Sequence, residues 1–147
     1  MGRTRLKIWA AGLAVLAACQ SEPSGPVSLP LADAASIHLF ATNGDDWTSH
    51  VPLTTGYTAR IAVKLYTASG REITPPLHPL DMSFSFAPAT LAAATVADSA
   101  LLLFDITPHD PPGADGGVTV ELTEPLSGTT KSFGQFYVLV HPATASR

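Results

Sequence analysis

Apolar and polar residues alternate along several segments of this chain, and no segment carries a sustained apolar stripe of helical period. Ile61, Val63 and Leu65 are each separated by one more polar or smaller residue, and the same period of two recurs in 82–86 and 118–122. Since successive side chains of a β-strand point to opposite faces, each segment predicts a strand with one apolar face. This alternation restricts the chain to an all-β fold.

Other segments read as strands with more continuous apolar runs, at 36–42, 100–106 and 132–141. Weaker candidates lie at 51–53 and 91–96, and the alanines of the latter also permit a short helix. Gly, Pro, Asn and Asp residues separate these segments at short intervals, where the chain must reverse. Short strands joined by tight turns predict an antiparallel β-sandwich of about seven strands.

The number and spacing of these strands resemble an immunoglobulin-like domain, although the Cys…Trp…Cys signature of that family is absent and Trp47 falls in a turn. A barrel or a jelly-roll fragment is the alternative architecture. The alternation also predicts which side chains form the core: Ile37, Leu39, Ile61, Val63, Leu65, Met82, Phe84, Phe86, Leu101, Leu103, Val118, Val120, Leu122, Phe136, Val138 and Val140.

The N-terminus has the features of an export signal. Arg3, Arg5 and Lys7 precede an uncharged apolar stretch at 8–18, which is shorter than the about 20 residues that a membrane-spanning helix needs. A basic head, a short apolar body and a small-residue end are typical of a secretory signal peptide. We therefore expect residues 1–18 to be a signal peptide.

The end of this segment, Leu16-Ala17-Ala18-Cys19, resembles the lipobox of bacterial lipoproteins. The resemblance implies that Cys19 is acylated and becomes the mature N-terminus, which ties the protein to a membrane of the bacterial cell envelope. Gln20, at the position where Asp retains many lipoproteins in the inner membrane, favours the outer membrane. Cys19 is also the single cysteine of the chain, so an intramolecular disulfide is excluded.

The mature chain divides into three parts. Prolines, serines and a glycine in 19–35 predict a flexible tether after the acylated cysteine. The β-sandwich is expected to span 36–142, and residues 143–147 to form a short tail.

Charge excludes one class of function. Loss of the three basic residues of the signal peptide leaves five Lys and Arg against twelve Asp and Glu, a net charge of −7 over the 129 residues from Cys19 onward. Such a surface repels polyanions, so nucleic-acid binding is not expected.

Five histidines (His38, His50, His78, His109 and His141) raise the possibility of metal binding, because imidazole is a good ligand for copper and zinc. No two are close enough in sequence for a His-x-His or His-x₃-His pair, so a site would be assembled across strands. His38 and His141 lie on strands that could pair or neighbour each other, which makes them the weak candidates for a metal site. A periplasmic copper- or zinc-binding lipoprotein is therefore the alternative function.

Catalysis is not expected. The nucleophile elbow, the zinc-protease helix, the P-loop and the dinucleotide fingerprint are all absent, and the sequence implies no cofactor. A small hydrolase would need a Ser–His–Asp set brought together only by the fold. Aromatic residues, by contrast, can form a face that binds protein or carbohydrate, with Tyr57, Tyr66, Phe133, Phe136 and Tyr137 as candidates. The sequence thus favours a lipid-anchored envelope protein with a non-catalytic binding or structural domain, whose partners are envelope proteins or glycans.

Overall fold

The computed structural model of the protein describes residues 25–144; the predicted signal peptide and Cys19 lie outside the described residues. Within that range no helix is long and apolar enough to cross a membrane. The described part contains one 3-10 turn and nine strands: η1 (Leu31–Asp33), β1 (Ser36–Ala41), β2 (Val51–Thr54), β3 (Ala59–Tyr66), β4 (Glu72–Ile73), β5 (Asp81–Ala87), β6 (Ala92–Asp98), β7 (Leu103–Pro108), β8 (Asp115–Glu124) and β9 (Thr129–His141).

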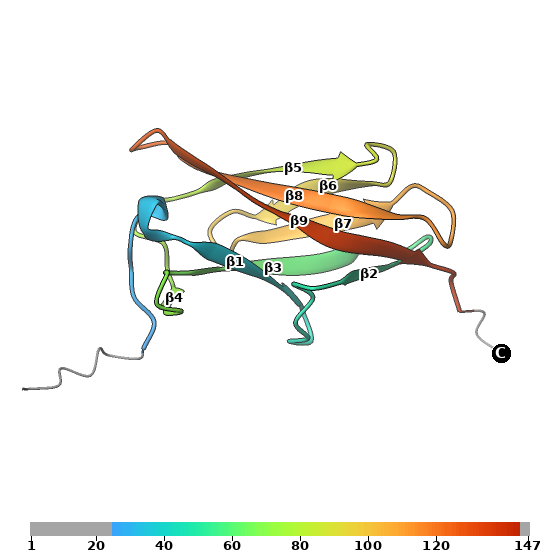
Figure 1. Ribbon diagram of the computed structural model, residues 1–147, viewed down its shortest axis with the longest axis horizontal. Helices are drawn as coiled ribbons and strands as arrows, with labels where there is room; N and C mark the ends of the chain where they lie inside the picture. The colour runs from blue at the N-terminus through green and yellow to red at the C-terminus, as the bar shows by residue number, and fades with distance from the viewer. Residues whose placement is uncertain (1–24, 145–147) are drawn as a thin grey trace, which may run out of the picture.

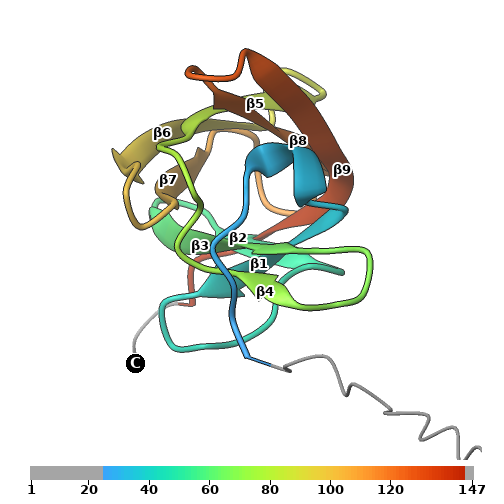
Figure 2. The same ribbon diagram turned by 90° about the vertical axis from the view of Figure 1, so that its left-hand side faces the viewer.

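The strands form two sheets, and Figures 1 and 2 show them as two layers. One sheet has the order β1-β3-β7-β6, with β4 beside β3, and the other has the order β2-β9-β8-β5. If β1 and β2 are counted as one strand and β4 is set aside, seven strands remain. Numbered in chain order, strands 1, 2, 5 and 4 lie side by side in one sheet, and strands 3, 6 and 7 in the other. This is the strand order of immunoglobulin-like domains. The predicted all-β sandwich is confirmed.

One strand pair departs from the antiparallel expectation. β2 runs parallel to β9, with Val51 opposite Val138 and Leu53 opposite Val140. The chain leaves the first sheet after β1, and β2 then joins the edge of the second sheet in the direction of β9. Val51 and Leu53 are both fully buried, so this short strand helps to close the sandwich.

The core lies between the two sheets and follows the predicted alternation over most of its length. Ile61 and Leu65 of β3 and Val118, Val120 and Leu122 of β8 are buried. Phe84 and Phe86 of β5 are only half-buried, because β5 is an edge strand. Phe84 nevertheless packs on Phe104 across the interior, with the ring centroids 4.4 Å apart.

The predicted strand at 100–106 is wrong in its start and its facing. β7 begins at Leu103, and the side chains that point inward are Leu102, Phe104 and Ile106. Leu101 is 66% exposed and Leu103 is half-buried. Leu102 has a positive φ of 51°, and the β6–β7 register shifts between Val96 and Asp98. Residues 101–104 are all apolar, so their pattern fits either facing, and the turn that ends at the left-handed Leu102 sets the one observed.

β9 contains a similar irregularity. Val118 pairs with Phe136 and Val120 with Phe133, so β9 carries one residue more than β8 over this stretch. The extra residue lies at Gly134–Gln135, where Gly134 has a φ of 121°. Such a bulge brings Phe133 and Phe136 to the same side, against the core, although their sequence spacing is odd.

The tether predicted over 19–35 is too long. Val27 forms a bridge to Ile73, and Leu31 and Ala34 are buried in the core. These residues are held by groups far away in sequence: Glu124 accepts a hydrogen bond from the Leu31 N–H, and Lys131 donates to the carbonyls of Ala32 and Ala34. The packed body therefore begins at Val27 rather than at residue 36.

The two ends of the described chain lie at opposite ends of the sandwich (Figure 1). The segment that leads into η1 enters beside β4 and the β4–β5 loop, and β9 leaves at the far end. We refer to the first of these ends as the η1 end.

Candidate functional site

Three aromatic rings lie in a row on the outer face of the β1–β3 pair. Inward residues Ile37 and Leu39 alternate with outward His38 and Phe40, and His38 lies opposite Lys64 in the register. The His38 ring is 4.7 Å from that of Tyr66 and 6.3 Å from that of Phe40, measured between centroids. All three rings are partly exposed. We call His38, Phe40 and Tyr66 the aromatic row.

Polar and charged side chains flank the aromatic row in close contacts. Lys64 Nζ lies 5.1 Å from the centroid of the Phe40 ring and 3.5 Å from Glu72 Oε1. His38 Nδ1 lies 3.6 Å from Asp46 Oδ2. Hydrogen bonds from the Thr48 side chain and main chain lower the pKa of Asp46, and His38 adds to this effect. Asp46 is therefore a carboxylate at neutral pH.

A third pair continues along the same face of the sheet. Arg60 Nε and Nη2 donate to the two carboxylate oxygens of Asp105 at 2.8 and 2.9 Å. The guanidinium of Arg60 lowers the pKa of Asp105, first through these hydrogen bonds and then through its charge. The face thus offers polar edges and apolar rings, with Lys64 and Arg60 each paired with a carboxylate.

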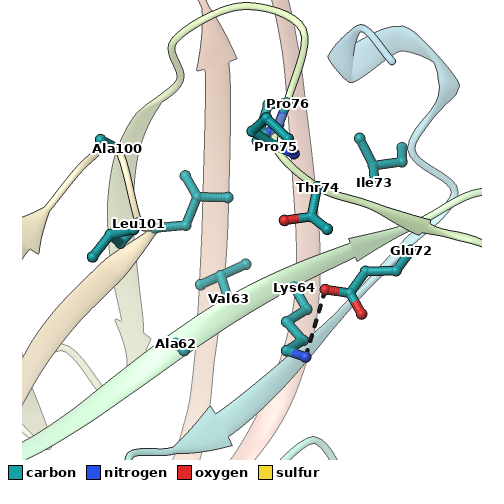
Figure 3. Close-up of a pocket in the computed structure, with 11 residues that line it drawn as sticks. Ala62, Val63, Lys64, Glu72, Ile73, Thr74, Pro75, Pro76, Ala100 and Leu101 are labelled. Carbon is teal, nitrogen blue, oxygen red and sulfur yellow. Dashed lines mark ion pairs between the residues drawn. The ribbon is translucent and has the colours of Figure 1, made fainter. Parts of the chain in front are cut away.

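A groove of about 230 Å³ opens beside the aromatic row, and Figure 3 shows its walls. It arises because two short strands share one edge of β3: β7 pairs with residues up to Ala62 and β4 pairs from Leu65 onward. The intervening stretch of β3 therefore forms the floor of the groove. The Lys64–Glu72 pair lies at one side, Thr74 points its hydroxyl inward, and Leu101 faces them from the β6–β7 turn.

A second hollow of about 220 Å³ adjoins the groove at the η1 end. The two share Pro75, Pro76, Ala100 and Leu102, and the second extends along the β4–β5 loop to Leu80. Its walls are mainly apolar, so it provides contact surface rather than a set of polar groups.

The predicted histidine pair does not form. His38 belongs to the sheet of β1, whereas His141 ends β9 in the other sheet. The ring that does approach His141 is that of His50, 6.0 Å away between centroids, and His50 also lies 5.7 Å from Tyr137. Within residues 25–144 no three His, Cys, Asp or Glu side chains are grouped so that they could hold a metal ion.

The aromatic candidates from the sequence separate into different environments. Phe133 and Phe136 face the core, and Tyr57 stands alone with 61% of its surface exposed. Tyr137 donates a hydrogen bond to Asp115 at 3.2 Å, and its pKa is raised by desolvation and by that carboxylate. Only Tyr66 joins the aromatic row.

Sequence reasoning missed Phe40, Lys64 and Glu72. The alternation does place His38 and Phe40 on one side of their strand, and Lys64 and Tyr66 on one side of theirs. The β1–β3 register brings these two sets of side chains together, because it sets Ser36 opposite Tyr66. Neither segment alone encodes this register.

Comparison of the chain with protein-family models, with curated proteins and with solved structures finds no match.

Proposed function

We propose that this chain is a lipid-anchored protein of the bacterial cell envelope, in which an acylated Cys19 carries a non-catalytic binding domain.

 The anchor is supported by the lipobox-like segment before Cys19 and by the basic and apolar residues that precede it. The binding role is supported by one structural observation above all, the aromatic row with its flanking charge pairs.

The chemistry of this face suits a neutral polar ligand with an apolar side. The three rings provide flat apolar surface, and the side chains of Asp46, Lys64 and Glu72 provide acceptors and a donor around it. Lys64 and Arg60 are each paired with a carboxylate, so neither is free to select a polyanion. A sugar ring, with one apolar face and hydroxyls at its edge, fits this arrangement. We therefore propose an envelope glycan as the ligand.

The anchor is tested by changing Cys19. In the native host, the wild-type protein should partition into the detergent phase and the membrane fraction, and its N-terminal peptide should carry acyl groups by mass spectrometry. The Cys19→Ser variant should lose all three properties, because the acylated sulfur is removed. A wild-type protein that retains residues 1–18 and a free thiol would refute the anchor.

The binding face is tested by a matched pair of tyrosine variants. We expect Tyr66→Ala to reduce retention on insoluble peptidoglycan, and the affinity for soluble fragments of it, about tenfold or more, because a stacking ring is lost. Tyr57→Ala removes an exposed tyrosine outside the aromatic row and should bind like the wild type. Equal binding by the two variants would contradict the assignment of the face.

A further inference from the structure

Three strongly exposed leucines lie at the η1 end. Leu77 in the β4–β5 loop is 51% exposed, Leu101 in the β6–β7 turn is 66% exposed and Leu126 in the β8–β9 turn is 76% exposed. Figure 2 views this end directly, with the three connections arranged around η1. Large apolar side chains presented together on one end of a domain indicate a contact surface.

The same three connections carry no ionised residue. Segments 74–80, 99–102 and 125–128 contain no Asp, Glu, Lys or Arg, and their single titratable side chain is His78. Carboxylates border these connections: Asp33 lies in η1, Asp81 directly follows the β4–β5 loop and Asp98 directly precedes the β6–β7 turn. The three exposed leucines, carried on uncharged connections between these carboxylates, are what this end offers to a lipid surface.

The chain that leads to Cys19 leaves from this end. The Val27 N–H donates to the Glu72 carbonyl, and the Leu77 N–H donates to the Leu29 carbonyl, so the segment is fixed beside the β4–β5 loop. Cys19 and Val27 are eight residues apart, which limits their separation to about 29 Å even for a fully extended chain. The η1 end is therefore the part of the sandwich that stays nearest to Cys19.

We propose that the η1 end rests on the lipid surface that holds Cys19, with Leu77, Leu101 and Leu126 at the boundary between headgroups and acyl chains. This inference rests on the proposed acylation of Cys19. It adds an orientation: the long axis of the sandwich stands away from the bilayer, and the aromatic row lies along its side, accessible to ligand.

The test uses the acylated full chain, in which the sulfur of Cys19 is blocked and a newly introduced cysteine is the only one that reacts. Leu77→Cys, Leu101→Cys and Leu126→Cys are each labelled with a small fluorophore and reconstituted into phosphatidylethanolamine–phosphatidylglycerol vesicles that contain lipids brominated on the acyl chains. We expect about twofold or greater quenching at all three positions, because these lie 5–10 Å into the interface. Tyr57→Cys, on the β2–β3 turn at the opposite end, is the control and should not be quenched.

A second variant separates the contribution of the label from that of the protein. Adding Leu101→Ser and Leu126→Ser to the labelled Leu77→Cys protein should abolish the quenching while acylation and the folded sandwich are retained.

Acylated protein whose label at the η1 end is quenched no more than at position 57 would overturn the inference and leave the anchor intact. Labels that are shielded from both brominated lipid and aqueous iodide would indicate a second copy on this end and would also overturn it. Absence of acylation by mass spectrometry would refute the anchor itself, and this inference with it.

Discussion

Glu124 is the one buried charged residue within residues 25–144, and its surroundings explain why a carboxylate is tolerated there. It accepts hydrogen bonds from the Leu31 N–H at 3.2 Å and from the Ser127 hydroxyl. The Ser127 hydrogen bond is the main cause of a lowered pKa; burial opposes it, and the Leu31 N–H and the charge of His78 support it. A buried carboxylate with two donors thus joins the β8–β9 turn to η1.

Glu124 should make the stability of the protein depend on acidic pH. Because its pKa is lower in the folded than in the unfolded state, it stabilises the fold above its ordinary pKa of 4.5, and this contribution disappears as the pH falls through the folded value. Glu124→Gln should lower the melting temperature at pH 7 and flatten its decline between pH 5 and pH 3. Thermal unfolding over that range measures the effect. Glu121→Gln, an exposed change on the same strand, is the control and should leave the decline unchanged.

Adjacent leucines in the β6–β7 turn should differ sharply in their contribution to stability. Leu102 is 5% exposed, whereas Leu101 is 66% exposed. Leu102→Ala should lower the free energy of unfolding by about 2–5 kcal/mol, because it leaves a cavity in the core. Leu101→Ala should change it by less than about 0.5 kcal/mol. Urea unfolding of the two variants tests whether Leu102, rather than Leu101, faces the core.

At the scale of elements, η1 depends on the β8–β9 hairpin. Lys131 Nζ lies 2.6 Å from each of the carbonyl oxygens of Ala32 and Ala34. Lys131→Met should release this end of η1 and speed amide exchange over residues 31–35, while exchange in β3 and β8 stays slow, because their pairing is untouched. Hydrogen–deuterium exchange with mass spectrometry measures both regions. Lys64→Met is the control, and comparable exchange at 31–35 in the two variants would show that the Lys131 contacts do not hold the turn.

The crossing of β8 past the β5–β6 turn requires a glycine. A Cβ on Gly116 would overlap the Ala87 carbonyl oxygen and lie 2.9 Å from Leu91 Cδ2, whereas a Cβ on Gly117 would meet mainly the flexible side chain of Gln135. Gly116→Ala should therefore cost about 1–3 kcal/mol of unfolding free energy. Gly117→Ala should cost less, since Gln135 can move aside. Chemical denaturation of the pair compares them, and an equal loss would argue against the close approach of the Ala87 backbone.

The elements that could be predicted from the sequence are those whose facing depends on local alternation. β3, β5 and, from Val118 onward, β8 keep a period of two, and their inward residues follow from it. The prediction is wrong where apolar residues are continuous, as at 101–104 around the start of β7, because such a run does not show which alternate residues face inward. It also misses η1, because Leu31 and Ala34 are held by side chains more than ninety residues away in sequence.

The candidate site was less predictable than the fold. His38 and Tyr66 were singled out from the sequence, but for different reasons and without a link between them. Their contact depends on the β1–β3 register, and the groove depends on two strands sharing one edge of β3. Neither relation leaves a trace in the local residue pattern, since both are properties of strand pairing.

At the scale of the whole molecule, net charge bears on how the protein could attach to a membrane. Residues 19–147 have a net charge of −7, so electrostatics alone should not hold them on an anionic membrane. Protein beginning at residue 19 and carrying Cys19→Ser should stay in solution when mixed with phosphatidylglycerol vesicles, because three exposed leucines without acyl chains bind only weakly. Vesicle flotation measures this. Stable co-flotation of the unacylated protein would show that the sandwich itself is sufficient for attachment.

The placement of the chain ends at opposite poles of the sandwich has a practical consequence (Figure 1). With Cys19 in a membrane, a passenger sequence fused after Pro142 would be presented a full domain length above the lipid, clear of steric hindrance from headgroups. The folded domain would then hold the fused sequence away from the membrane. An epitope tag fused after Pro142 should be accessible to antibody on the side of the membrane that the domain occupies.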